Sequence, residues 1–168
     1  VRAAAKTGGN REKRGTGFNI HSDGLIVTNR HLVENAAYIT IFFPGRRNYQ
    51  ALGWSSSPAA DLAIITLRGE DLPVAALEDS LPVIGEKVII IGNPLNFIKV
   101  VMRGEVTDYQ EVEGLPEPLL ELDAPIQRGS SGSPVFNEEG RVVAVVFATV
   151  ESGEKGERRG LALPVSLL

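Results

Sequence analysis

The sequence predicts an all-β protein made of two antiparallel barrels or sandwiches joined by one crossing segment. Short runs of alternating or β-branched residues recur about every ten residues, and Gly, Pro, Asn and Asp separate them. No segment shows a sustained apolar period of about 3.6 residues, and strands do not alternate with helices. These two observations argue against helical bundles and α/β folds.

The expected strands fall into two groups on either side of residues 69–86. Pro73 and Pro82 stand in this segment among acidic residues and loosely spaced alanines and leucines, so we interpret it as a linker. The N-terminal unit then covers about residues 1–72 and the C-terminal unit about 84–168. Helix is expected only at 32–37 and at the chain end. The expected strands are 17–20, 25–28, 38–43, 50–54 and 62–67 before the linker, and 87–91, 100–107, 119–124, 134–136, 141–150 and 160–164 after it.

Composition and charge exclude several classes of function. The 168 residues are 43% hydrophobic and 23% charged, which is ordinary for a soluble domain with a proper core. The net charge of −4 offers no global basic field to nucleic acid or an anionic membrane. We interpret the basic cluster of Arg11, Lys13 and Arg14, interrupted by Glu12, as a solvated loop tip. The absence of cysteine excludes disulfides, cysteine-ligated metals and thiol catalysis.

A serine among glycines stands out in the stretch from Asp123 to Val135. Ser131 lies between Gly129 and Gly132, after one apolar strand and before another apolar run. The glycines allow a tight turn that points backbone N–H groups at one spot beside the serine. Acyl transfer needs such paired amide donors beside a nucleophilic oxygen. Because ordinary turns are also rich in Gly and Ser, the interpretation depends on residues elsewhere.

Two histidines and one aspartate supply those residues. His21 lies in a predicted hairpin turn, where a polar residue is ordinary, whereas His31 directly follows an apolar strand. Asp61 precedes another apolar strand, where a carboxylate costs free energy unless it is hydrogen-bonded. Orienting an imidazole would satisfy it, and so would a role as a cap or turn residue. The order His31, Asp61, Ser131 is that of chymotrypsin-type enzymes and not of α/β-hydrolases.

Longer segments resemble trypsin-like serine proteases, most closely the HtrA (DegP-type) branch. They are 15–18 (Gly-Thr-Gly-Phe), 23–33 (Asp-Gly-Leu-Ile-Val-Thr-Asn-Arg-His-Leu-Val), 61–65 (Asp-Leu-Ala-Ile-Ile), 123–132 (Asp-Ala-Pro-Ile-Gln-Arg-Gly-Ser-Ser-Gly) and 160–164. The resemblance covers nearly the whole chain. It implies two antiparallel six-stranded β-barrels with the active site in the cleft between them.

The resemblance also implies a role for each matching residue. Ser131 would be the nucleophile, His31 the general base and then acid, and Asp61 the residue that holds the imidazole tautomer. The amides of Gly129 and Ser131 would form the oxyanion hole. The edge that pairs with substrate would consist of Phe147, Ala148 and Thr149, and the S1 pocket would be lined by Ile126, Val146 and Gly160. These apolar walls predict small or medium apolar P1 residues.

Two serines depart from the HtrA pattern. Ser130 replaces the Asp or Asn common before the nucleophile, and Ser133 replaces a glycine. The resulting Gly-x-Ser-Gly-Ser-Pro-Val-Phe-Asn also resembles glutamyl endopeptidases. Those enzymes bind an acidic P1 through a histidine fifteen residues beyond the serine, and here that position is Val146. Acidic P1 specificity is therefore not expected.

The N-terminus lacks the Ile-Val-Gly-Gly start that activates trypsin-like zymogens. Ordering of active-site loops would then control activity, with residues 94–99, 108–117 and 151–158 as candidates. The alternative is that these segments are only surface turns.

The expected function is a serine endopeptidase that cleaves unfolded or exposed protein segments in a periplasmic, cell-envelope or secreted setting. Its partners would be polypeptide substrates, with no nucleic acid, metal or cofactor. A homo-oligomer is possible, and so is a C-terminal PDZ domain outside this chain, which ends at Leu168. The alternative is a catalytically silent peptide-binding module on the same fold.

Overall fold

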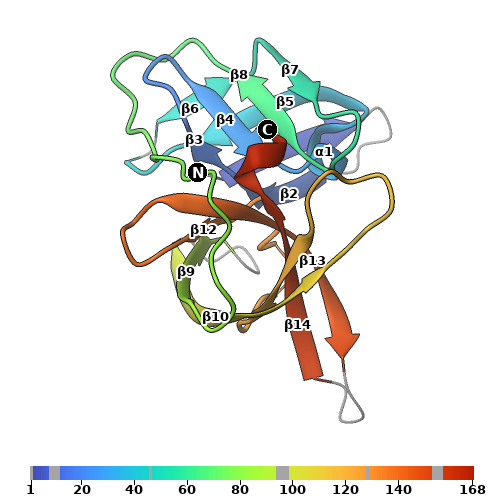
Figure 1. Cartoon of the computed structure of the whole chain (residues 1–168). Helices are drawn as coiled ribbons and strands as arrows, with labels where there is room; N and C mark the ends of the chain where they lie inside the picture. Colours follow the sequence, from blue (N-terminus) through green and yellow to red (C-terminus); the bar gives the residue numbers. More distant parts are fainter. Residues whose placement is uncertain (1, 8–11, 46, 94–98, 128, 153–156) are drawn as a thin grey trace.

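The protein consists of two β-rich halves, one above the other in Figure 1. The computed structural model describes residues 2–7, 12–45, 47–93, 99–127, 129–152 and 157–168. The strands of the N-terminal half are β1 (Arg2–Thr7), β2 (Glu12–Thr16), β3 (Phe18–Asn19), β4 (Leu25–Thr28), β5 (Ala36–Phe42), β6 (Asn48–Gln50), β7 (Gly53–Ser56) and β8 (Ala63–Thr66). Those of the C-terminal half are β9 (Lys87–Gly92), β10 (Val100–Gln110), β11 (Leu119–Asp123), β12 (Pro134–Phe136), β13 (Val142–Ser152) and β14 (Glu157–Pro164).

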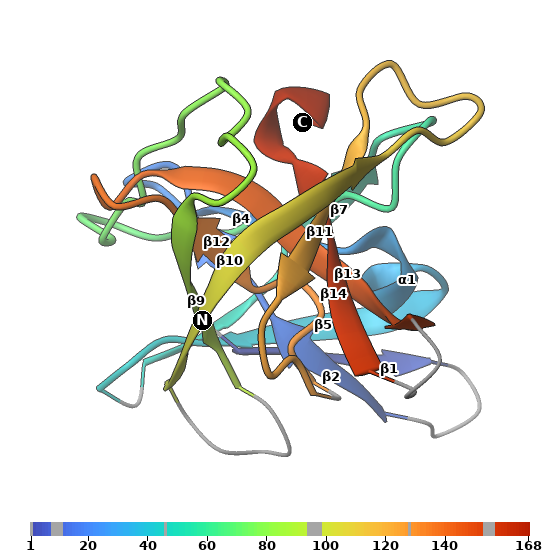
Figure 2. The same cartoon turned by 60° about the horizontal axis from the view of Figure 1, so that its bottom comes forward.

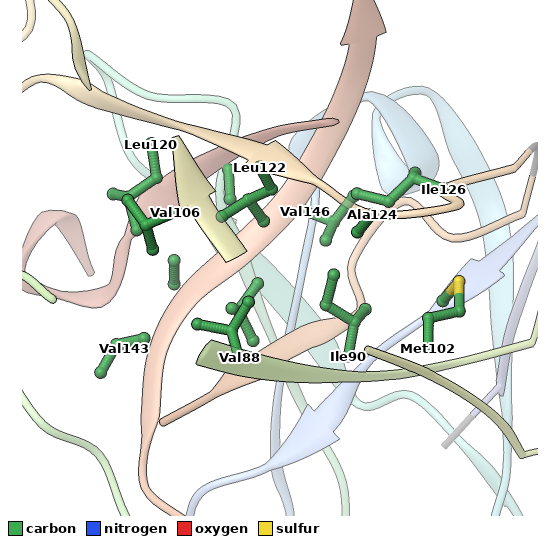
Figure 3. Close-up of a cluster of buried hydrophobic side chains, with 13 residues drawn as sticks. Val88, Ile90, Met102, Val106, Leu120, Leu122, Ala124, Ile126, Val143 and Val146 are labelled. Carbon is green, nitrogen blue, oxygen red and sulfur yellow. The ribbon is translucent and has the colours of Figure 1, made fainter. Parts of the chain in front are cut away.

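The C-terminal half is a closed antiparallel barrel of six strands, in the order β10-β11-β14-β13-β12-β9. Exposed and buried residues alternate strictly along β9, because successive side chains of a strand point to opposite faces. Figure 3 shows Val88 and Ile90 of β9 directed into the barrel toward Val106, Leu122 and other apolar side chains. Burial thus alternates along a continuous apolar run, and the inward-facing residues of that run contribute to the core of the barrel.

The N-terminal half differs from the expected six-stranded barrel. It contains two four-stranded sheets, in the orders β2-β1-β5-β6 and β3-β4-β8-β7. Strands β1 and β2 were not predicted. The segment that forms β1, Arg2–Thr7, is rich in alanine, which does not favour strands. Pairing of β1 between β2 and β5 overrides that local preference and buries Ala3 and Ala5 in the apolar core of this half.

The helices are shorter than expected. Helix α1 covers Arg30–Val33 only, because Asn35 adopts a positive φ of 59° and β5 begins at Ala36. The chain end forms the 3₁₀ turn η2 (Val165–Leu167). The strand expected at 50–54 is divided between β6 and β7. The segment 108–117, expected as a loop, still belongs to β10 as far as Gln110.

The crossing segment between the halves is hydrogen-bonded to both. On the N-terminal side, the Ala75 amide donates to the Asn19 carbonyl at 2.8 Å. On the barrel side, Leu77 forms a bridge with Val142, and the hydroxyl of Tyr109 donates to the Pro82 carbonyl. An apolar cluster that includes Phe18 and Val27 from one half and Leu161 and others from the barrel lies between the halves. These contacts fix the position of one half against the other.

After β14 the chain ends in η2 beside the N-terminal half, where Leu167 lines a pocket with Ser55 and Ile64 (Figure 1). Figure 2 shows the long strand β10 running across the barrel. In the described part of the chain, no helix has the length and apolar character needed to span a bilayer.

Candidate active site

His31 and Asp61 form a close pair in the N-terminal half. His31 lies in α1, directly after β4, and Asp61 lies just before β8, the strand that pairs with β4. One carboxylate oxygen of Asp61 is 2.5 Å from His31 Nδ1, and the other accepts the backbone N–H of His31 at 2.8 Å. The two contacts fix both the position of the carboxylate and the orientation of the ring.

The carbonyl of Asp61 is held in turn by the strand end that carries His31. It accepts hydrogen bonds from Asn29 Nδ2 at 3.0 Å and from the Arg30 amide at 3.3 Å. Asn29 is fully buried. Sequence reasoning missed this residue, although an asparagine at the end of an apolar strand is a signal that could have been noticed.

Ser131 lies in a tight loop between β11 and β12 of the barrel. Gly129 and Gly132 both have positive φ, 96° and 82°, a conformation that glycine adopts at no steric cost. A Cβ at Gly132 would be only 2.0 Å from the Thr16 carbonyl oxygen, so this position also needs glycine for space. The Gly132 amide donates to the Val146 carbonyl at 2.8 Å, which ties the loop to β13.

His31 and Ser131 face one pocket of about 460 Å³, and Gly129 lines it as well. The Ser131 hydroxyl donates to the Phe147 carbonyl at 3.5 Å, and no hydrogen bond joins it to His31 among the described residues. Catalytic hydrogen bonds are often long or absent until substrate is bound. The structure therefore brings the three residues of the predicted triad to the same region, from both halves of the molecule.

The amides of Gly129 and Ser131 are the expected oxyanion donors. Within the described residues neither amide donates a hydrogen bond, whereas their loop neighbours Ser130 and Ser133 donate to Gln127 and Ser130 carbonyls at 3.0 and 2.9 Å. Amide donors that are free among the described residues and belong to the loop that carries a hydroxyl can bind a developing negative charge.

The residues expected to bind substrate lie on β13 and around it. Beyond Val146, β13 pairs with β14 on one side, and Phe147 lies at a bulge in that pairing. Its other partner β12 pairs only as far as Val145, which leaves Ala148 and Thr149 beyond the end of that ladder. Ile126 and Gly160 are in close contact, since a Cβ at Gly160 would lie 2.1 Å from Ile126 Cδ1.

The two serines that depart from the family pattern are fully buried. Ser130 Oγ accepts the Gln127 amide at 3.4 Å, whereas Ser133 Oγ has no hydrogen-bond partner among the described residues. The hydroxyl of Ser133 fits because residue 92 is glycine: a Cβ there would be 2.5 Å from Ser133 Oγ.

Lys13 and Arg14 correct one interpretation of the sequence. They belong to β2 and line the pocket that holds His31, so they are not a loop tip; Arg11 lies outside the described residues. The Glu12 carboxylate accepts a hydrogen bond from Arg14 at 2.8 Å and raises the pKa of its guanidinium. Much of the segments 94–99 and 151–158, the proposed control loops, also lies outside the described residues. Among those described, no group of His, Cys, Asp and Glu could hold a metal ion.

Known proteins match most of the chain. A family model described as the trypsin-like peptidase domain matches residues 15–145. A probable periplasmic serine endoprotease of the DegP-like type from Pseudomonas putida is 36% identical over 136 residues, and one from Marinomonas sp. is 34% identical over 142 residues. The matches cover 78% and 82% of this chain but only 28% and 30% of those relatives. The chain therefore spans less than a third of the length of these curated relatives.

Solved structures match it over almost its whole length. The serine endoprotease from Yersinia pestis superposes with a TM-score of 0.83 at 28% identity, covering 99% of this chain and 58% of that one. The Rv3671c protease from M. tuberculosis in its active form gives 0.82 at 22% identity, covering 98% and 74%, and so shows the fold alone. Because the family model covers well over half of the residues, the chain belongs to the trypsin-like peptidase family, and its relatives are serine endoproteases of the DegP type.

Proposed function

We propose that this chain is a serine endopeptidase that hydrolyses peptide bonds through an acyl-enzyme on Ser131. The observation that carries the proposal is that His31, whose Nδ1 lies 2.5 Å from Asp61, lines the same pocket as Ser131 and as Gly129, whose amide donates no hydrogen bond among the described residues. A nucleophile, an oriented base and oxyanion donors are the parts that acyl transfer requires.

In the first half of the reaction, Ser131 Oγ attacks the carbonyl carbon of the scissile bond while His31 Nε2 takes its proton. The negative charge on the carbonyl oxygen is bound by the amides of Gly129 and Ser131. His31 then gives its proton to the leaving amine, and the C–N bond breaks to leave an ester on Ser131. Asp61 accepts a hydrogen bond from the Nδ1–H group of His31 throughout and stabilises the imidazolium, without taking the proton.

In the second half, a water molecule attacks the ester carbonyl, and His31 takes its proton. The same two amides bind the second oxyanion. When the intermediate collapses, Ser131 regains its proton from His31 and the acyl product leaves as a carboxylic acid. Each group thus acts twice, once in each direction of proton transfer.

The substrate would bind as an added strand along Phe147, Ala148 and Thr149 of β13. Strand addition requires an extended backbone, so unfolded or exposed segments are the proposed substrates. Ile126 and Val146, proposed for the S1 wall, are only 6% and 1% exposed, and Ile126 lies against Gly160. This close packing favours small or medium apolar P1 side chains. Because the matched relatives are named periplasmic, we propose an extracytoplasmic location.

Hydrolysis of denatured casein by the wild-type chain and by Ser131→Ala tests the proposal. Cleavage that disappears in Ser131→Ala is the expected result, and equal cleavage by both proteins would overturn the assignment. A second candidate function, a silent peptide-binding module, is favoured by the absence of a hydrogen bond between Ser131 and His31. An organophosphonate that forms no adduct with Ser131 in a chain that still binds peptides would support this candidate.

A further inference from the structure

We infer that the leaving-group side of the active site is a cationic subsite that favours acidic residues just after the scissile bond. The inference rests on the proposed function and adds a substrate class to it. The pocket that holds His31, Gly129 and Ser131 is also lined by three cationic side chains. They are Arg2 of β1 and Lys13 and Arg14 of β2.

The composition of this pocket indicates which part of a substrate it would receive. It includes none of the residues proposed for the acyl side, which are Ile126, Val146, Phe147 and Gly160. In the proposed binding mode, the substrate residues before the scissile bond lie along β13. The residues after the scissile bond continue beyond Ser131, away from β13. The pocket therefore accommodates the residues that follow the scissile bond.

The positive charges are only partly compensated. Glu12 is the one acid among the described lining residues, and it is paired with Arg14. Lys13 Nζ donates to the His31 carbonyl at 2.6 Å and lies 3.6 Å from Glu34, which does not line the pocket. The whole chain has a net charge of −4, so a pocket with a surplus of positive charge stands out against its surroundings.

Lys13 is also held in place by the helix that carries His31. Its ammonium group donates to a backbone carbonyl of α1, so the Lys13 side chain has already lost part of its conformational entropy in the free protein. Forming an ion pair with substrate then costs less entropy. The side chains of Lys13 and Arg14 remain 37% and 47% exposed, so a substrate carboxylate can reach them. An exposed ion pair of this kind changes affinity by up to about fivefold.

Internally quenched peptides that differ only at the second residue after the scissile bond test this subsite. We expect kcat/KM to decrease in the order Glu, Gln, Lys, with a Glu-to-Lys ratio of about ten at low salt that shrinks as salt screens the charges. Lys13→Gln combined with Arg14→Gln should bring the ratio close to one. Lys87→Gln is the matched control, since Lys87 pairs with Glu105 and does not line the pocket.

The ratio is measured within each variant, so a general loss of activity caused by Lys13→Gln cancels. A wild-type ratio near one, or a ratio that the double substitution leaves unchanged, would overturn the cationic subsite. Ser131→Ala separates this from the proposed function, because cleavage in that variant would overturn the function itself.

We also propose that Thr16 is a positioning residue for the oxyanion hole. Its backbone N–H donates to the Ser131 carbonyl at 2.9 Å, and its hydroxyl donates to the Gly129 carbonyl at 3.1 Å. Gly129 and Ser131 are the residues whose amides are the proposed oxyanion donors. Thr16 thus holds both of them by their carbonyl groups, from the other half of the molecule.

The hydrogen bonds of Thr16 leave it little freedom. Besides donating to Gly129, its hydroxyl accepts from the Asn93 amide at 3.0 Å and from Asn93 Nδ2 at 3.2 Å, so its donor and both lone pairs are used. Its carbonyl accepts the Thr28 hydroxyl at 2.7 Å, and the residue is 1% exposed. The β-branched side chain is itself stiff at χ1.

Thr16→Val keeps the branched shape and the backbone bond but removes the hydroxyl. We expect kcat to fall about tenfold while KM changes by less than about twofold, because the affected interaction is made in the transition state. Thr16→Ser should restore most of kcat, since it keeps the hydroxyl. Thr107→Val is the matched control: its hydroxyl also donates to a carbonyl, that of Glu121 at 3.2 Å, within the barrel.

Wild-type kcat in Thr16→Val would overturn the positioning role, and so would a failure of Thr16→Ser to rescue it. Loss of kcat in Thr107→Val of the same size would show a general effect of lost stability instead. Cleavage by Ser131→Ala would again overturn the proposed function and not the role of Thr16 alone.

Discussion

Replacing Asp61 by asparagine is the sharpest perturbation of the proposed triad, because the structure dictates how the new side chain must sit. The His31 backbone N–H donates to one carboxylate oxygen at 2.8 Å. An amide NH₂ group cannot face that donor, so the asparagine oxygen must take this place. Its NH₂ group then faces Nδ1, where the carboxylate oxygen lies at 2.5 Å in the native protein.

The consequence is the wrong tautomer of His31. An NH₂ group donates to Nδ1, which moves the ring proton to Nε2, the nitrogen that must accept the proton of Ser131. A substitution of this kind lowers kcat by about 10⁴-fold, which corresponds to about 5 kcal/mol of transition-state stabilisation. Stability should change by less than about 1 kcal/mol, because every hydrogen bond has a replacement.

Steady-state cleavage of a quenched peptide and urea unfolding measure the two effects separately. The chain offers a matched control in its other histidine–aspartate pair, since His21 Nδ1 lies 3.7 Å from an oxygen of Asp23 with both side chains largely exposed. Asp23→Asn should leave kcat unchanged. The reasoning is refuted if Asp61→Asn retains kcat within tenfold of the wild type, or if Asp23→Asn is equally damaging.

Three further substitutions test the packing of the Ser131 loop and of the crossing segment. Ser133→Ala removes a buried hydroxyl with no partner among the described residues, so urea unfolding should show unchanged stability or a gain of about 1 kcal/mol, and a clear loss would contradict this. Gly132→Ala should lower the free energy of unfolding by about 3 kcal/mol or more and abolish turnover. Gly140→Ala, at a similar φ of 76° but with open space around it, should lower the free energy of unfolding by only about 1 kcal/mol in the same assay. Equal losses would rule out the steric clash. Burial raises the pKa of the Tyr109 hydroxyl above its ordinary value of 10.0. The stability that the neutral hydroxyl contributes is therefore fully present below pH 10.0 and is lost as the pH rises through the raised pKa. Tyr109→Phe should cost about 1 kcal/mol at neutral pH, through the lost bond to Pro82, and should lessen the alkaline loss of stability seen by unfolding at increasing pH; identical pH dependence in both proteins would contradict the role of burial.

The barrel was easier to predict from the sequence than the N-terminal half. The expected strand 87–91 and the observed Lys87–Gly92 agree closely, because four consecutive β-branched residues favour a strand and a glycine follows them. Strands β1 and β2 carry no such signal. Ala3 and Ala5 are buried only because β1 lies between two partners, and β5 is more than twenty-five residues away in the chain.

The residues of the candidate site also differ in how well the sequence predicts them. His31, Asp61 and Ser131 could be proposed from residue type and order, since each follows or precedes an apolar strand. Thr16 could not be singled out, because its partners Gly129 and Ser131 belong to the other half of the molecule. The basic residues of β2 were misread for the same reason: their environment depends on strand pairing and not on neighbouring sequence.

The division of the candidate site between two halves makes their contact part of the proposed catalytic apparatus. The N-terminal half supplies His31 and Asp61, and the barrel half supplies Ser131, so the distance from the proposed base to the proposed nucleophile is set by how the halves meet. That contact is partly apolar, through Phe18 and its neighbours. Apolar packing is not directional and would tolerate small shifts, whereas proton transfer requires hydrogen-bond geometry. The hydrogen bond of 2.9 Å from the Thr16 amide to the Ser131 carbonyl supplies that direction, because it joins the proposed nucleophile to the half that carries the proposed base.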